Sequence, residues 1–329
     1  MPERWQIDKP KVIDIGSEQE SVIACKVALV GGRVDIVTHD DSPTARVEVH
    51  EVGGRPLEVS WNGSTLRVSH VKDHDSSLWD SFLHIAKGDS KLSARVSISV
   101  PATALVTVST VSADALLNGF RASVKGNTVS GVLTIDDVQG EVKANTVSGE
   151  IECHDLRGDL HANTVSGAIT VQQSTLPNVR LNTVTGDIAL DLRNRSARVS
   201  SNSVSGDVTV RVPAGEGYDV TAHTASGDVV IDGRSMRGEQ GQRGGQLREG
   251  DGGLVVRANS VSGSVVVLRA GSSPQPPHVG SDSAVQDTPP TAVQDTPPAP
   301  PAPQTGPATP AVPPTQEPAA PSGWDEAPR

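Results

Sequence analysis

Apolar and polar residues alternate with a period of two along the middle of the chain, where the period of an amphipathic helix is absent. Apolar residues stand two and four positions after a recurring glycine, and many positions between them hold Thr, Glu or Asp. Short strands with one face in a core and one in solvent produce this pattern. The apolar pairs are Leu133 and Ile135, Ile151 and Cys153, Ile169 and Val171, Ile188 and Leu190, Val208 and Val210, Val229 and Ile231, and Val265 and Val267.

The recurring glycine closes a pentapeptide that reads Asn-Thr-Val-Ser-Gly or a close variant. The steps between the first residues of successive copies are 18, 18, 19, 20, 21 and 36. Repeats of this length without a helical period are typical of a β-solenoid, in which each repeat forms one coil and coils stack at roughly 4.8 Å. The copies are residues 127–131, 145–149, 163–167, 182–186, 202–206, 223–227 and 259–263, with a degenerate copy at 109–113.

The predicted fold class is therefore all-β, a β-solenoid (β-helix-like) of seven to eight coils of about 18–21 residues that occupies residues 106–270. Residues 1–105 alternate less regularly and are divided by Gly-Gly, Asn-Gly and Asp-Ser turns, so we expect an irregular β N-terminal cap there. Residues 233–253 fall within the last step and are rich in Gly, Arg, Gln and Glu. We expect them to form a loop inserted into one coil.

Each pentapeptide position has an expected structural role. Stacked asparagine amides form a ladder, the glycine forms a corner, and the valine fills the core, while Thr128 and Ser130 with their equivalents point outward. The expected asparagine ladder consists of Asn127, Asn145, Asn163, Asn182, Asn202 and Asn259. The expected corner glycines are Gly131, Gly149, Gly167, Gly186, Gly206, Gly227 and Gly263.

Two segments lie outside the repeat pattern. Large apolar residues cluster at 78–85, which we expect either to cap the core as one or two helical turns or to form a contact patch. The candidate patch residues are Leu78, Trp79, Phe82 and Leu83. Residues 271–329 hold 17 of the 24 prolines, and such a composition predicts a disordered Pro-rich tail.

Composition limits the partners, the cysteine chemistry and the cellular compartment that we expect. The chain of 329 residues has a net charge of −11, which argues against nucleic acid as a partner. The two cysteines, Cys25 and Cys153, lack disulfide or metal-ligand spacing and are interpreted as ordinary buried residues. The sequence shows neither a signal peptide nor a stretch of about 18 apolar residues, so we expect a cytoplasmic protein without a transmembrane segment.

The repeats follow three further β-rich motifs: residues 31–37 (Gly-Gly-Arg-Val-Asp-Ile-Val), 45–49 (Ala-Arg-Val-Glu-Val) and 96–101 (Val-Ser-Ile-Ser-Val-Pro). Together with the repeats, they resemble the bacterial putative-adhesin β-strand repeat family, a domain of unknown function, over about residues 20–268. The resemblance implies a β-solenoid and carries over no catalytic residues. The word adhesin also implies display outside the cell.

An enzyme is the first functional alternative, and its only candidate groups are four carboxylates that follow pentapeptide glycines: Glu150, Asp187, Asp207 and Asp228. Ala168 interrupts this column, and we find no Arg or Lys repeating beside it that would hold a transition state. The column is a weak candidate for a metal ion such as Ca²⁺, or else a solvated acidic stripe. His154 and His161 have no Ser or Cys partner in register, so no catalytic triad is predicted.

The leading hypothesis is therefore a noncatalytic scaffold or interaction protein that uses no cofactor. Its partner is an unknown protein or a second copy of the chain. The alternatives are a surface adhesin or a carbohydrate- or Ca-binding β-helix. An ice-binding face is disfavoured because Ser replaces Thr in most copies and breaks the regularity of the methyl groups.

Overall fold

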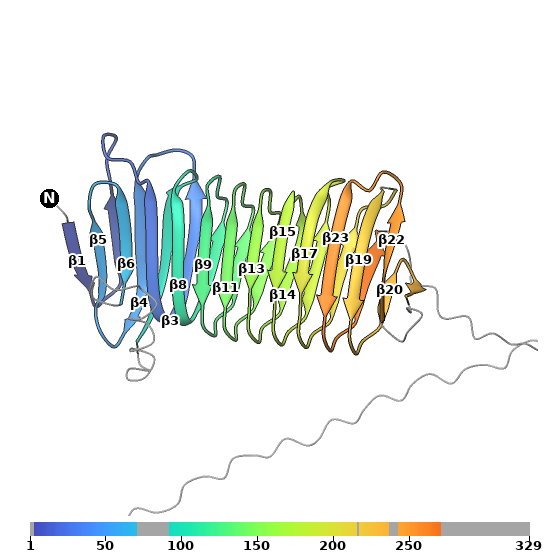
Figure 1. Cartoon of the computed structure of the whole chain (residues 1–329). Helices are drawn as coiled ribbons and strands as arrows, with labels where there is room; N and C mark the ends of the chain where they lie inside the picture. Colours follow the sequence, from blue (N-terminus) through green and yellow to red (C-terminus); the bar gives the residue numbers. More distant parts are fainter. Residues whose placement is uncertain (1–2, 71–91, 216, 237–242, 271–329) are drawn as a thin grey trace, which may run out of the picture. The chain divides into compact units, whose positions relative to one another are not determined.

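The computed structural model describes residues 3–70, 92–215, 217–236 and 243–270, and every regular element within them is a β-strand. The strands join into a continuous sheet that winds around an apolar core (Figure 1). The predicted all-β solenoid is confirmed. In the part of the chain that the structure describes, no helix has the length and apolarity needed to cross a membrane.

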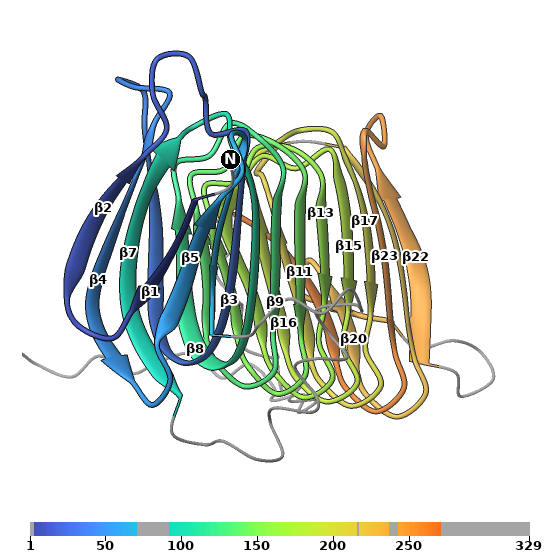
Figure 2. The ribbon, with the colours of Figure 1, turned by 90° about the vertical axis from the view of Figure 1, so that its left-hand side faces the viewer.

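Two walls of strands face each other across the core, and the repeats supply most of both. The first wall contains β9 (Val124–Thr128), β11 (Val142–Thr146), β13 (Leu160–Asn163), β15 (Asn178–Asn182), β17 (Ala197–Asn202), β23 (Leu254–Ser260) and β19 (Tyr218–Thr224). The second wall contains β10 (Leu133–Asp136), β12 (Ile151–His154), β14 (Ile169–Ser174), β16 (Ile188–Leu192), β18 (Val208–Val212), β24 (Val265–Arg269) and β20 (Val229–Ile231). Neighbouring repeat strands in each wall are parallel, and Figure 2 shows the first wall along its length.

The N-terminal end continues both walls. Its strands are β1 (Glu3–Ile7), β2 (Lys11–Ile15), β3 (Ala24–His39), β4 (Ala45–Gly53), β5 (Leu57–Trp61), β6 (Thr65–Ser69), β7 (Ser93–Pro101) and β8 (Leu105–Asn118). The first half of β3 pairs with β6 and its second half with β7, so β3 crosses from one wall to the other. Gly32 has a φ of +103° within β3, and a Cβ there would collide with the backbone of Ala94.

The predicted N-terminal β region is present as mixed β structure. The antiparallel strands β1 and β5 extend the first wall, and β2 and β4 extend the second. β8 pairs with β3 over its whole length and with β9 and β10 in the repeats. The predicted boundary between residues 105 and 106 therefore does not divide two cores, and Met1–Pro276 forms one compact unit.

The core consists of the inward residues of both walls, and these are aliphatic as the alternation predicts. Leu133, Ile151 and Ile169 are buried in successive coils, in register with one another. Burial raises the pKa of the Cys153 thiol, in the same wall, to about 12. Cys25 is also buried and free, and its pKa is likewise raised to about 12 by burial. Both thiols behave as small core residues.

The predicted orientation of the pentapeptide is wrong by one residue at the corner. The threonine is buried and the valine points outward, with exposed fractions of 38–52% at Val147, Val165, Val184, Val204 and Val261. The reason is a local hydrogen bond: the hydroxyl of Thr164 accepts the backbone N–H of Gly167 at 2.9 Å. At a buried corner this N–H needs an acceptor, and a hydroxyl three residues earlier supplies it. The following Ser or Thr points outward as predicted.

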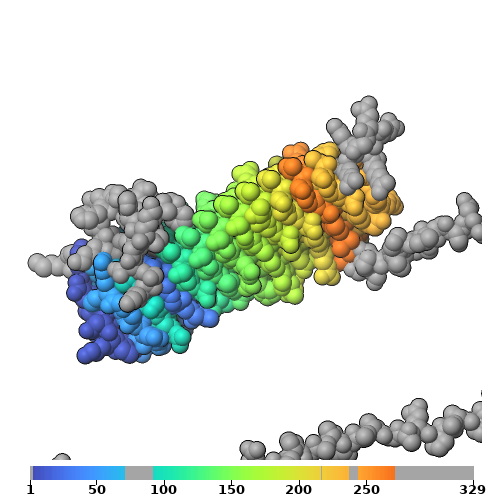
Figure 3. Space-filling model, turned by 90° about the horizontal axis from the view of Figure 1, so that it is seen from below, coloured from blue at the N-terminus to red at the C-terminus, as the bar shows by residue number. Residues whose placement is uncertain are grey.

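The stacking order of the last coils differs from their order in the chain. β23 pairs with β17 on one side and with β19 on the other, so the coil of residues 254–269 lies between two earlier coils. Figure 3 shows the darker orange atoms of this coil between the yellow and gold atoms of the coils before it in sequence. Repeat spacing predicts which residues align, but it does not predict which coil is adjacent to which.

The predicted inserted loop, residues 233–253, contains two strands. β21 (Arg234–Ser235) pairs antiparallel with β20, and β22 (Arg243–Glu249) pairs antiparallel with β19. Leu247 of β22 packs against the core. β22 covers the edge of β19 that would otherwise be open, which explains why this segment is a strand rather than a loop.

Two predicted features lie outside the described residues. One is the cap or contact patch of Leu78, Trp79, Phe82 and Leu83, and the other is the Pro-rich tail from residue 271 onward.

Candidate functional site

The carboxylates of the candidate acidic column hold backbone groups of neighbouring coils. Asp187 Oδ1 accepts the N–H of Asp207 at 2.9 Å, and Asp207 Oδ1 accepts the N–H of Ser264 at 2.8 Å. Because Ser264 precedes Asp228 in the stack, the carboxylates do not form a continuous column. Within the described residues, no group of three His, Cys, Asp or Glu side chains is arranged to hold a metal ion.

The six asparagines of the repeat lie in one line along the first wall. In five of them the side-chain Nδ2 donates to the Oδ1 of the asparagine in the preceding coil, from Asn145 to Asn127 at 3.1 Å and from Asn163 to Asn145 at 2.9 Å. The series continues through Asn182 at 2.8 Å, Asn202 at 2.9 Å and Asn259 at 3.1 Å. These bonds join six consecutive coils on the outer surface.

The corner glycines occur where coils approach most closely. A Cβ at Gly167 would collide with the carbonyl oxygen of Gly149 in the preceding coil, and the other pentapeptide glycines are equally close to a backbone oxygen of the adjacent coil. None of these glycines has a positive φ. Close packing of the coils, rather than a special dihedral angle as expected from the sequence, requires glycine at this position.

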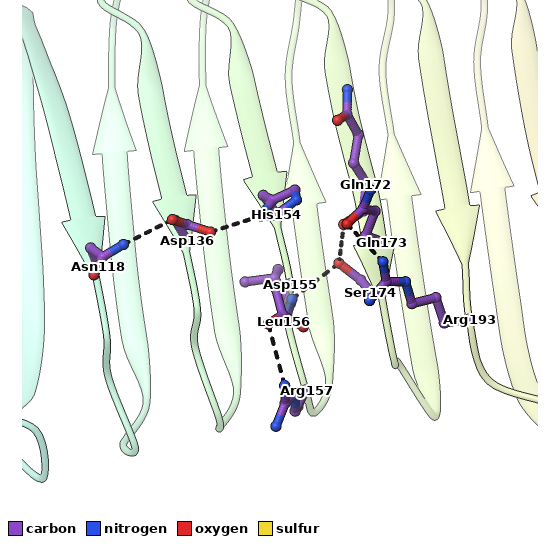
Figure 4. A network of polar contacts seen from close by, with 10 residues as sticks. All are labelled: Asn118, Asp136, His154, Asp155, Leu156, Arg157, Gln172, Gln173, Ser174 and Arg193. Carbon is purple, nitrogen blue, oxygen red and sulfur yellow. Dashed lines mark hydrogen bonds and ion pairs between the residues drawn. The ribbon is translucent and has the colours of Figure 1, made fainter.

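The outer surface of the second wall carries a polar network that joins its coils (Figure 4). Asp136 accepts a hydrogen bond from the Asn118 amide at 2.8 Å and lies 2.9 Å from Nδ1 of His154. The hydroxyl of Ser174 is buried and accepts the N–H of Leu156 at 3.1 Å. His154 therefore pairs with a carboxylate, but these contacts tie one coil to the next and do not activate a nucleophile.

A partly buried cluster around Tyr218 joins strands at the C-terminal end of the stack. The hydroxyl of Tyr218 donates to Asp232 at 2.6 Å, and the Arg269 guanidinium lies 4.7 Å from the centre of the tyrosine ring. Burial, followed by the hydrogen bond to Asp232, raises the pKa of Tyr218 to about 12. Arg269 also pairs with Glu249 of β22. The cluster thus joins β22, at the end of the stack, to β19 and to β24 of the coil that lies out of chain order.

A row of mainly basic and polar side chains runs along the outer face of the first wall. Thirteen residues align in register from β1 to β22, and seven of them are Lys or Arg, one is His, and none is acidic. In stack order, this basic row is Arg4, Ser60, Arg67, Lys26, Thr107, Lys125, Lys143, His161, Arg180, Ser200, Arg257, Thr221 and Gln246.

This row is not among the features predicted from the sequence, although the repeat contains its signal. The basic residues of the repeats stand two positions before the first residue of the pentapeptide, as in Lys125, Lys143, His161, Arg180 and Arg257. That position points away from the core and lies beside the asparagine ladder on the same face. An alignment of the repeats that uses only their apolar positions does not compare the outward positions, so it does not reveal this pattern.

A groove of about 610 Å³ lies over the C-terminal half of the basic row, from His161 to Arg257. Its lining combines cationic, imidazole, amide and hydroxyl groups with three valine residues. The polar lining residues are His161, Asn178, Arg180, Arg198, Ser200 and Arg257. Such a lining can hold an anionic ligand through charge and hydrogen bonds.

Solved structures that match the chain include three proteins that each cover most of it. A putative cell adhesion protein from Clostridium sporogenes is 12% identical, covers 80% of this chain and 100% of its own, and has a TM-score of 0.26. A putative lipid binding protein from Parabacteroides distasonis is 15% identical, covers 79% of this chain and 97% of its own, and has a TM-score of 0.46. A putative adhesin from Bacteroides fragilis is 14% identical, covers 78% of this chain and 97% of its own, and has a TM-score of 0.39.

The comparison with curated proteins finds no match. A family model does match the chain, over residues 37–268, and this range includes all seven pentapeptides and both walls of the repeat region. The resemblance seen in the sequence is thereby confirmed. The chain belongs to the Toastrack DUF4097 family.

Proposed function

We propose that the protein is a noncatalytic interaction scaffold that works through the outer face of its first wall. The observation that carries this proposal is the unbroken register of thirteen outward positions from β1 to β22. Strands paired on both sides cannot shift independently, so the side chains of this face keep fixed positions relative to one another. A face of this kind suits the binding of an extended partner.

The positions of the titratable groups support a noncatalytic role. Asp187 and Asp207 hold backbone N–H groups, and His154 pairs with Asp136. The groove over the basic row is lined by cations, amides and hydroxyls and has no carboxylate in its lining. General acid–base chemistry in the groove would therefore depend on His161 alone, without an orienting carboxylate among the lining residues.

Photo-crosslinking in the native cell tests the proposal. A photoreactive amino acid is placed at Ser200 on the first wall or at Thr209 on the second, two outward positions of the same coil. We expect adducts of higher mass from position 200, whether with a protein or with a polymer, and few from position 209. The same adducts from both positions, or none from either, would contradict a scaffold that binds through the first wall.

The compartment distinguishes a cytoplasmic scaffold from a surface adhesin, because both would use the same face. Fractionation of intact cells, followed by protease treatment from outside, separates them. Protection of the chain in intact cells supports a cytoplasmic scaffold. Cleavage without lysis supports the adhesin.

A further inference from the structure

The basic row has a charge opposite to that of the whole molecule. The chain has a net charge of −11, yet the row holds seven Lys and Arg and no Asp or Glu. Like charges directly opposite each other on neighbouring strands, at roughly 4.8 Å, repel and destabilise a sheet. Arg67 lies opposite Lys26 and Lys125 lies opposite Lys143, which breaks this rule of sheet stability twice in one row, and such violations are expected at functional sites.

Most cations in the repeat part of the row are available to a ligand. Lys125, Arg180 and Arg257 are exposed, and within the described residues none of them forms an ion pair. Lys143 pairs with Glu141 at 2.7 Å, on the side away from the asparagine ladder. On the second wall, in contrast, Arg211 lies 3.9 Å from Asp191.

The groups beside the row define two different borders. The asparagine ladder lies two residues further along each strand, at roughly 7 Å, and presents amides on the same face. On the other side, Asp159 accepts a hydrogen bond from Asn178 at 2.9 Å, and Arg198 adds another cation. A ligand between the basic row and the asparagine ladder would therefore meet cations along one edge and amides along the other.

Two common classes of linear partner fit this face poorly. A peptide that adds a strand needs an open sheet edge, whereas the strands from β9 to β19 are paired on both sides. Single-stranded nucleic acid is held by stacking on aromatic side chains, and the row and its groove have no aromatic residue other than the imidazole of His161. Recognition must come from side-chain charges and amides.

We propose that the basic row binds an unbranched, carboxylated polysaccharide that lies along the stack. The carboxylates of the polymer pair with Lys125, Arg180 and Arg257, and its hydroxyl groups bond to the asparagine amides. Lys or Arg occupies seven of the thirteen register positions, so the row offers a cation on average at about every second strand, roughly 8–10 Å apart. A polymer with a carboxylate on every sugar can pair with each of these cations. This inference rests on the proposed scaffold function and names the class of its partner.

Titration calorimetry of the full chain with polygalacturonate tests the inference, in a buffer with a chelator so that divalent cations do not contribute. We expect binding that weakens at least about tenfold between roughly 50 mM and 200 mM salt. Polygalacturonate whose carboxyl groups are methyl esters keeps the backbone without the charge and should not bind. Absence of binding by the charged polymer would overturn the inference.

Paired variants locate the site. Arg180→Ser with Arg257→Ser removes two cations of the row, and Ser is tolerated there because Ser200 occupies the same position in the coil between them. Arg193→Ser with Arg211→Ser removes the same charge from residues outside the row. We expect at least a tenfold loss of affinity from the first pair and less than a twofold loss from the second, with unchanged circular dichroism in both. Equal losses would overturn the assignment.

Two further ligands test the class of polymer. Polyglutamate and oligothymidylate of similar charge should bind more weakly than polygalacturonate, and tighter binding of either would show that the class is wrong. The scaffold itself is judged separately by crosslinking. A protein adduct at position 200 together with no polygalacturonate binding would refute only the polysaccharide, whereas the absence of adducts would refute the scaffold.

Discussion

At the scale of single residues, the corner of most coils depends on a hydroxyl rather than on an apolar side chain. Five pentapeptides have the same bond, in which the Thr or Ser oxygen accepts the glycine N–H three residues later, at 2.9–3.2 Å. The neighbouring valine is then turned toward solvent. Threonine and valine have nearly the same shape, so hydrogen bonding decides which of them enters the core.

An exchange of these two residue types tests the corner. Thr164→Val leaves the buried N–H of Gly167 without an acceptor and should lower the free energy of unfolding by about 1–3 kcal/mol. Val165→Thr changes an exposed position and should alter it by less than about 0.5 kcal/mol. Denaturant unfolding measures both. An equal loss in the two variants would refute the hydrogen-bonded corner.

His70 provides a test of pH dependence. The ring is buried, and burial lowers its pKa from 6.5 to about 4. The unfolded chain therefore binds a proton more readily than the folded chain, and stability is complete above pH 6.5 and falls as the pH decreases toward 4. The loss reaches about 3 kcal/mol at most.

The measurement compares unfolding midpoints at pH 7 and pH 5 for the parent and for His70→Gln. Because Gln does not titrate, the variant should lose less stability than the parent over this interval. If both lose the same amount, other groups cause the acid sensitivity and His70 does not contribute.

At the scale of elements, the sequence predicts strands well and their order less well. Apolar pairs such as Ile169 and Val171 point inward as expected, because alternation directly reports which face is buried. The asparagine hydrogen bonds also follow from equal repeat spacing. The position of β23 between β17 and β19 does not follow, because every repeat has the same pattern of apolar positions and fits equally well beside any other.

Engineered disulfides test this order. Ser200 and Arg257 are register partners on β17 and β23, so the variant Ser200→Cys with Arg257→Cys should oxidise to a disulfide. Ser200 and Thr221 are separated by one strand, at roughly 10 Å, which exceeds the reach of a disulfide. The native thiols are buried and should not compete.

Peptide mass spectrometry after mild oxidation identifies the bonds. A disulfide in Ser200→Cys with Thr221→Cys, together with none in the first pair, would show that coils stack in chain order.

The basic row of the candidate site could not be recognised from the repeat pattern alone. In the sequence, the carboxylates that follow the glycines are the candidates for a metal site. In the structure, Asp187 and Asp207 accept backbone N–H groups instead. The basic residues two positions before each pentapeptide become a row only when all coils are in register. The N-terminal members Arg4, Lys26 and Arg67 lie outside the repeats, so no periodicity could have placed them there.

At the scale of the whole unit up to Pro276, the stacking of coils places equivalent outward positions of the short repeat in one long row. Thirteen register positions at roughly 4.8 Å extend the row to between about 55 and 60 Å. Each cation alone would bind an anion weakly in water, but many at fixed spacing act on one polymer together. Function in this account belongs to the row as a whole rather than to one residue.

The affinity of the protein for galacturonate oligomers of increasing length tests this claim most directly. We predict that affinity rises with each added sugar until the oligomer spans the row, and that it then levels off. An affinity that is already maximal for a short oligomer would show a single local site and would contradict the row as the binding surface.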